Sequence, residues 1–100
     1  MSISSGTMTA LVSLGTQAAA SIGSASATQI SLSSGKSQIS VQNTGTKPIW
    51  IGDSNVAPSS SRGWRLNPTD GYEFKECKVG FSFYAKCASG ESSTLSIVEG

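Results

Sequence analysis

The sequence predicts an all-β protein, a small antiparallel β-sandwich of about seven short strands that follows an extended N-terminal arm rich in Ser, Ala and Gly. Three observations carry this prediction. Apolar and polar residues alternate with a period of two, which is typical of strands that bury one face. Turn-forming residues separate these runs at intervals of about ten residues, as in sandwiches and small barrels. No comparable window has an apolar stripe at helical spacing.

The chain divides into an arm that spans residues 1–28 and a sandwich domain that spans residues 29–100. Charge and aromatic content mark the division, because residues 1–46 contain a single charged residue, Lys36, and all seven aromatic residues lie at or after Trp50. The sandwich strands are expected where apolar and polar residues alternate, namely at Ile30 and Leu32, Ile39 and Val41, Ile49 and Ile51, Trp64 and Leu66, Tyr72 and Phe74, Phe81 to Cys87, and Leu95 and Ile97.

The arm contains one candidate strand, residues 8–14, in which Val12 and Leu14 lie on one face. Residues 21–27 have the composition of a flexible linker. Two arrangements fit such an arm. It adds its backbone to an exposed sheet edge of a neighbouring subunit, or it packs on its own sandwich. A secretory signal peptide is not expected, because no Lys or Arg precedes Lys36.

Composition excludes several classes of protein. There is no histidine, so Ser-His or Cys-His catalysis and histidine-ligated metals are excluded. Only 13% of the residues are charged, about half the usual share of roughly 25%, and the net charge is +1. A nucleic-acid-binding surface is therefore not expected. No apolar run reaches the roughly eighteen residues that a membrane span needs, so no membrane association is expected.

The carboxylates do not form a catalytic or metal-binding pattern. Asp70, Glu73 and Glu76 are spaced by three, which places neighbours on opposite faces of a strand. Asp53 and Asn55 offer oxygen ligands for calcium, but a single carboxylate falls short of such a site and a β-turn is expected instead. We therefore expect a protein that is not an enzyme and that takes no cofactor or metal.

Cys77 and Cys87 allow two interpretations. As a disulfide they would close a loop of about ten residues and stabilise the fold by roughly 2–3 kcal/mol. As free thiols they would be two small, partly buried side chains made in a reducing cytoplasm.

The tryptophans are the candidate interface or binding residues of the sandwich. Trp50 lies between Ile49 and Ile51, so its strand is apolar on both sides and is expected to be covered on both faces. Trp64 is close to Arg62 and Arg65 and allows three interpretations: it fills the core, anchors a protein interface or stacks on a sugar ring. The candidate interface residues are Met8, Val12, Leu14, Trp50, Arg62, Trp64 and Arg65.

From Ser37 onward the order of features resembles a known group. The strand Gln38-Ile39-Ser40-Val41-Gln42 leads into Asn43-Thr44-Gly45. Pro48-Ile49-Trp50-Ile51-Gly52 and a polar loop with Val56, Gly63 and Leu66 follow. After Gly71 come an aromatic strand that ends Phe83-Tyr84-Ala85, the turn Ser89-Gly90-Glu91-Ser92-Ser93 and a strand Thr94-Leu95-Ser96-Ile97-Val98-Glu99. This pattern, over about two-thirds of the chain, resembles small β-sandwich accessory proteins of tailed-bacteriophage virions, of the head decoration (cement) or head-fibre type.

The resemblance implies a non-enzymatic structural protein of the virion, assembled in the bacterial host cytoplasm. Such a protein binds the major capsid protein or another virion protein, stabilises the outer capsid lattice, and forms a homo-oligomer, with a trimer favoured. The low surface charge also favours a component that packs against other protein. The alternative is a tail- or fibre-associated sandwich that binds host-surface glycan, through Trp64 and its arginines, or another virion protein.

Overall fold

The structure is a computed structural model, and it describes residues 17–100. The candidate strand at residues 8–14, with Met8, Val12 and Leu14, lies outside the described residues. Residues 17–100 form eight strands: β1 (Gln17–Ile22), β2 (Thr28–Ser31), β3 (Ile39–Asn43), β4 (Ile49–Gly52), β5 (Trp64–Leu66), β6 (Gly71–Phe74), β7 (Ser82–Lys86) and β8 (Ser93–Glu99). The helical structure of this part is a 3₁₀ turn at Pro58–Ser60.

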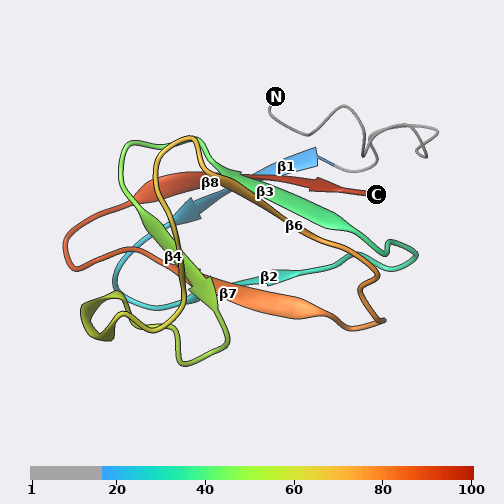
Figure 1. Ribbon diagram of the computed structural model, residues 1–100, viewed down its shortest axis with the longest axis horizontal. Coiled ribbons are helices and arrows are strands. Elements are labelled where there is room, and N and C mark those ends of the chain that lie inside the picture. Colours follow the sequence, from blue (N-terminus) through green and yellow to red (C-terminus); the bar gives the residue numbers. More distant parts are fainter. Residues whose placement is uncertain (1–16) are drawn as a thin grey trace.

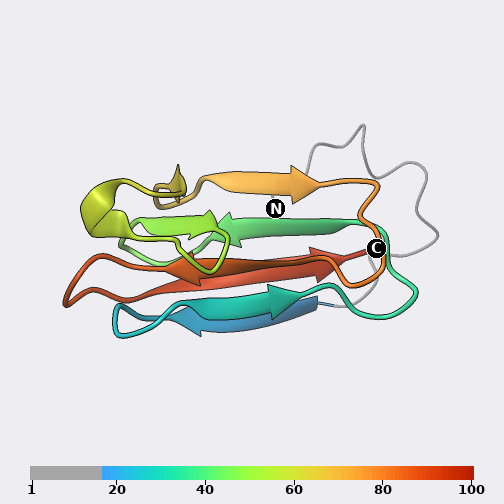
Figure 2. The same ribbon diagram turned by 90° about the horizontal axis from the view of Figure 1, so that it is seen from below.

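The strands form two antiparallel sheets, in the orders β1-β8-β3-β6 and β2-β7-β4-β5. Figure 1 shows the two layers, with β8, β3 and β6 above β2 and β7. In the view of Figure 2, β6 lies along one side of the molecule, and β1 and β2 lie along the other. This order of eight strands is that of a jelly roll. The predicted all-β sandwich is therefore confirmed, with eight strands in residues 17–100 rather than seven.

The core lies between the sheets and follows the predicted alternation. In β3, Ile39 and Val41 are buried, while Ser40 between them points outward. The same pattern runs through β8, where Leu95 and Ile97 are buried. Because inward residues of both sheets meet, the alternation of the sequence becomes a continuous apolar layer. Its buried members are Ile22, Ile30, Ile39, Val41, Ile49, Ile51, Leu66, Phe83, Ala85, Cys87, Leu95 and Ile97.

β1 corrects the linker expected at residues 21–27, whose first two residues belong to a strand. β1 pairs with β8 along its whole length, from Gln17 opposite Val98 to Ile22 opposite Ser93. Ile22 is fully buried. The small Ala and Ser residues of β1 give only a weak strand signal in the sequence. The pairing with β8 supplies the backbone hydrogen bonds that make this segment a strand. Within the described residues the sandwich thus begins before the expected boundary at residues 28 and 29.

Asn43 is a buried polar residue whose amide is fully used. Its Nδ2 donates to the carbonyls of Lys47 (2.7 Å) and Leu66 (2.9 Å). Its Oδ1 accepts from Gly45 N (3.1 Å) and Ser93 Oγ (2.8 Å). Gly45 has to be glycine, because a Cβ there would overlap Ser93 Oγ. The predicted turn after β3 is thus also the point that joins β3 to the end of β5.

Candidate functional site

The edge of the sandwich formed by β5 and β6 is open to solvent. By register Trp64 in β5 lies opposite Ile51 of β4, on the inward face of its sheet, yet its side chain is 62% exposed. Tyr72 in β6 lies opposite the buried Val41 and is 42% exposed. The interpretation of Trp64 as a core residue is therefore wrong. Both rings belong to the outermost strand of their sheet, where no further strand covers the gap between the layers.

Five aromatic rings form a continuous chain from this open edge into the core. Trp64 and Tyr72 have centroids 5.9 Å apart at an interplanar angle of 48°. Tyr72 meets Phe74 edge to face at 4.9 Å. Phe74 then contacts Phe81 at 5.1 Å and stacks on Phe83 at 5.0 Å. Such pairs stabilise one another beyond simple burial, so the exposed rings are held by the buried ones.

The chain of rings lines a groove of about 350 Å³, called the aromatic groove below. Its size is within the range of small-molecule sites, about 300–1,000 Å³. Its lining residues are Ile51, Gly52, Asp53, Trp64, Tyr72, Phe74, Phe81, Ser82 and Phe83.

At Gly52 and Asp53 the aromatic groove meets a second hollow of about 390 Å³, whose polar lining includes Asn55 and Arg62. Asp53 Oδ1 accepts the Asn55 amide hydrogen at 2.8 Å, and the Asp53 carbonyl accepts that of Val56. These bonds make the expected β-turn. Arg62 bonds Ala57 through both backbone groups. The aromatic groove thus adjoins a hydrogen-bonded turn that carries the Asp53 carboxylate and the Asn55 amide, and a hollow that Arg62 also lines.

Gly63 places Trp64 at the groove. Its φ of +121° is a conformation that side chains rarely adopt, and a Cβ there would lie 2.7 Å from Val56 Cγ2 and 2.8 Å from the Ile51 carbonyl oxygen. Close approach of the chain at this point requires glycine.

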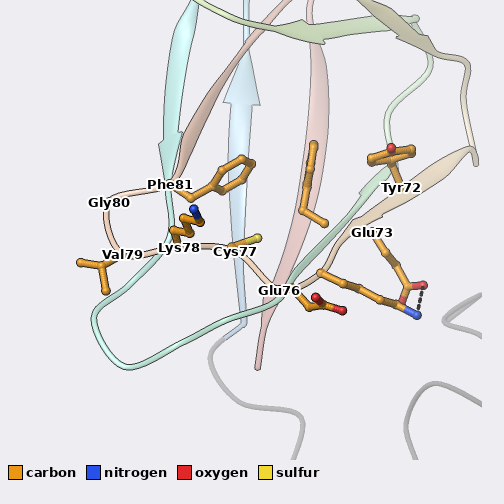
Figure 3. Close-up of a pocket in the computed structure, with 10 residues that line it drawn as sticks. Tyr72, Glu73, Glu76, Cys77, Lys78, Val79, Gly80 and Phe81 are labelled. Atoms are coloured by element: carbon orange, nitrogen blue, oxygen red, sulfur yellow. Dashed lines mark ion pairs between the residues drawn. The ribbon is translucent and has the colours of Figure 1, made fainter.

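A further pocket of about 550 Å³ lies on the other side of the same rings, against residues 75–80 between β6 and β7. In Figure 3, Tyr72 and Phe81 extend into it from opposite sides. Lys75 Nζ lies 3.9 Å from Glu73 Oε1 at its rim, as the dashed line in Figure 3 marks. Glu73 thus belongs to a surface ion pair.

The outer face of the β2-β7-β4-β5 sheet carries the two remaining aromatic residues. Trp50 lies opposite Lys86 of β7 and Arg65 of β5, and the Arg65 guanidinium carbon is 5.3 Å from the Trp50 ring centroid. This cation–π contact half-buries the Trp50 ring. The expectation that β4 is covered by protein on both faces is wrong within residues 17–100, because its outer face is covered by a side chain rather than by another layer.

The outer face of the β1-β8-β3-β6 sheet differs sharply, and its part over β1, β8 and β3 is called the neutral face below. Its outward residues are small or polar and carry no charge, and Glu73 in β6 lies at its margin. The residues of the neutral face are Gln17, Ala19, Ser21, Ser40, Gln42, Thr94, Ser96 and Val98.

Cys77 and Cys87 are free thiols rather than a disulfide. Cys87 lies in the core next to β7, and its Sγ donates to the Ile22 carbonyl at 3.4 Å. Burial raises the pKa of the Cys87 thiol, an effect reinforced by the Glu91 carboxylate and opposed by a hydrogen bond from the Ser93 backbone. Burial likewise raises the pKa of the Cys77 thiol. Both thiols therefore stay protonated at neutral pH.

Within residues 17–100, no three His, Cys, Asp or Glu side chains gather closely enough to hold a metal ion. No helix in this part is long and apolar enough to cross a membrane.

The buried carboxylate of Glu99 accepts hydrogen bonds from the Ser33 backbone amide (2.5 Å) and from Ser33 Oγ (2.9 Å), a contact that sequence reasoning did not anticipate.

Of the interface candidates in the described part, Trp64 and Arg62 lie around connected hollows, whereas Trp50 and Arg65 form their own pair on the outer face. Sequence reasoning missed Tyr72, Phe74 and Phe81 as members of the groove. The signal was present, because alternation places Tyr72 and Phe74 on one face, and Phe81 and Phe83 on one face. That these two faces lie next to each other follows from the order of the strands in the two sheets, which the local pattern does not encode.

No protein family matches the sequence, and no curated protein matches it. Among solved structures, the chain is similar to a de novo designed double-stranded β-helix whose structure was determined by solution NMR. The match has a TM-score of 0.61 and 15% sequence identity, and it covers 85% of this chain and 99% of the designed chain. At this identity the likeness concerns the fold alone. Residues 17–100 thus have an all-β fold similar to that of the designed protein.

Proposed function

We propose that the protein is a non-enzymatic structural protein of a phage particle, which binds the outer capsid lattice as a decoration or cement protein. The observation that carries this proposal is the neutral face. An exposed sheet face normally bears charges that keep proteins soluble and apart. This face is uncharged and made of small or polar side chains, so it can lie against another protein without leaving buried charges unpaired.

Two further features support the proposal. The order of strands and turns from Ser37 onward resembles virion accessory proteins, and jelly rolls are common in viral capsids. β1 borders the neutral face as the outermost strand of its sheet, with no further strand paired to it within residues 17–100. It directly follows residues 1–16, which contain no charged side chain. Such an outermost strand accepts an added strand from a neighbour. In this role, weak contacts repeated over a lattice, or within a homo-oligomer such as a trimer, add up to tight binding.

The first test is sedimentation of the native source material through a sucrose gradient. Co-migration with a particle of megadalton size supports the proposal, and migration as a free small protein contradicts it. Deletion of residues 1–16 then tests the arm, because it leaves β1 intact. We expect the shortened chain to keep its β-sheet circular dichroism and to lose particle binding.

Charge on the neutral face provides a matched pair of variants. T94E/S96E places two carboxylates on the neutral face, and Q29E/S31E places two on the outer face of the other sheet. We expect only the first variant to release the protein from particles. Equal binding of both variants would show that the neutral face is not the contact.

A further inference from the structure

We propose that the aromatic groove binds a neutral saccharide, with one pyranose ring stacked on Trp64 and its hydroxyl groups bonded to the polar turn at Asp53. This site does not rest on the structural role proposed above, because it lies at the β5–β6 edge and not on the neutral face.

The aromatic half of the groove matches the apolar face of a sugar ring. Trp64 and Tyr72 expose large parts of their rings, and their planes meet at 48°, so they form two walls of a corner. Axial C–H groups of a pyranose pack well against such ring faces. Tyr72 contacts Phe74, which in turn stacks on Phe83, so little side-chain freedom of Tyr72 is lost on binding.

The polar half matches the hydroxyl groups of the same ligand. Asp53 supplies carboxylate acceptors, Arg62 supplies guanidinium donors, and Asn55 supplies both. Neither Asp53 nor Arg62 forms an ion pair within residues 17–100. Asp53, Asn55 and Arg62 all line the hollow next to the groove. A ligand with an apolar face and a hydroxylated edge uses both halves at once.

Charge selects a neutral ligand over an ionic one. Asp53 lines both the groove and the neighbouring hollow, and Arg62 lines that hollow. Their opposite single charges sum to zero, so they attract neither an anion nor a cation. A purely apolar occupant, such as a leucine side chain from a partner protein, would cover these groups without supplying hydrogen-bond partners. A saccharide supplies those partners.

The test uses the two indole N–H signals of the chain in ¹H–¹⁵N NMR spectra. Trp50 lies on the outer face and Trp64 at the groove, so one signal reports the site and the other is an internal control. The Trp50→Phe variant assigns the two signals. The probes are neutral oligosaccharides of glucose, galactose, mannose and N-acetylglucosamine at millimolar concentration. We expect at least one of them to shift the Trp64 signal and leave the Trp50 signal unchanged.

Matched variants then locate the contacts. Trp64→Ala is expected to weaken binding by about tenfold or more, and Trp50→Phe to leave it unchanged. Arg62→Gln is expected to weaken binding, whereas Arg65→Gln, whose guanidinium lies over Trp50, leaves it unchanged. Asp53→Asn keeps an oxygen that accepts from the Asn55 amide, so its loss of affinity reports the carboxylate and not the turn. Circular dichroism verifies that each variant is folded.

Three outcomes would overturn the proposal. The first is a Trp64 signal that no saccharide of the panel shifts. The second is binding that persists in folded Trp64→Ala. The third is a Trp64→Ala variant that loses particle binding while the wild-type protein binds no saccharide, because the groove would then be a protein-docking surface. The sedimentation and neutral-face results are independent of these outcomes, so either proposal can fail alone.

Discussion

At the edge formed by β1 and β2, large inward-facing side chains are buried, whereas at the edge formed by β5 and β6 they reach solvent. Ile22 and Ile30 are 0% and 7% exposed, but Trp64 and Tyr72 are 62% and 42% exposed. All four residues occupy inward positions on outermost strands. Strand alternation therefore determines which face of the sheet a side chain points from, but it does not determine whether that side chain is buried.

The difference follows from side-chain size and from what each edge contacts. At the closed edge, short side chains such as Ala20 let the sheets approach, and Cys87 bonds the Ile22 carbonyl across them. At the open edge, an indole and a phenol meet in the gap between the sheets. Two such rings are too large to withdraw into a core about 10 Å thick that Phe74 and Phe83 already fill. The closed edge therefore adds to the stability of the fold, whereas the open edge exposes aromatic side chains that a ligand or partner can contact.

The largest expected effect comes from Asn43, which fixes the position of the open edge. Asn43→Ala removes four hydrogen bonds, including the buried bonds to the Leu66 carbonyl and from the Ser93 hydroxyl. Each buried polar group left unpaired costs about 1–3 kcal/mol, so we expect a loss of about 3–5 kcal/mol in the free energy of unfolding. Urea denaturation followed by circular dichroism measures it. Ser93→Ala, which removes one of these bonds, is the control and should cost about 1 kcal/mol. Equal losses for the two variants would mean that Asn43 is not the central contact.

The next effect compares the two edges directly. Ile22→Ala at the closed edge removes fully buried methyl groups and should lower the free energy of unfolding by about 2–5 kcal/mol. Trp64→Ala at the open edge removes a much larger side chain, yet should cost less than about 1 kcal/mol because most of it is in water. Urea denaturation of both variants measures the contrast. A larger loss for Trp64→Ala would break the comparison, and would mean that the open edge is covered in solution.

The smallest expected effect is the order in which the two thiols react with a reagent, which does not depend on a change in the free energy of unfolding at neutral pH. Cys87 is 1% exposed beside the closed edge, and Cys77 is half-buried below the open one. We expect a thiol reagent to modify Cys77 first in the native protein, and Cys87 only after denaturation. Mass spectrometry of the labelled peptides identifies the order, and Cys77→Ser should abolish the early reaction. Rapid modification of both thiols in the native protein would contradict the burial of Cys87 at the closed edge.

The raised thiol pKa values add a pH dependence with a defined sign. In the native state the thiols hold their protons to higher pH than in the unfolded chain. Their contribution to stability is therefore complete below the ordinary cysteine pKa and is lost as pH rises through the raised one. In Cys87→Ala the Cys87 part of this alkaline loss should disappear.

The sequence was sufficient to predict the sandwich because most strands carry their own signal. Ile39 and Val41 alternate clearly with polar residues, and so do Leu95 and Ile97. This alternation predicts which side chains of these strands face the core. β1 lacks this signal, since its identity as a strand depends on β8, far along the chain. For Trp64 three interpretations were open, namely a core residue, a protein interface and a sugar-stacking ring, and alternation could not decide between them. Its exposure depends on which strand lies at the end of each sheet.

The aromatic groove was predictable in composition and not in assembly. The concentration of aromatic residues after Trp50 was evident, as was the pairing of Trp64 with nearby arginines. The structure separates those arginines, because Arg65 covers Trp50 on the outer face while Arg62 lines the same hollow as Asp53. The contact between Trp64 and Tyr72 joins two different sheets, and no local pattern encodes a contact between sheets.

The position of β8 between β1 and β3 has a consequence for the order of events during synthesis. Gln17 pairs with Val98, so β1 emerges from the ribosome long before its partner exists. Pairings this distant in sequence form slowly, over milliseconds to seconds. Until β8 inserts, β1 and β3 have no common neighbour, and the neutral face does not exist as a surface. A growing chain therefore cannot present that face, so the contact proposed for it has to wait for a completed fold.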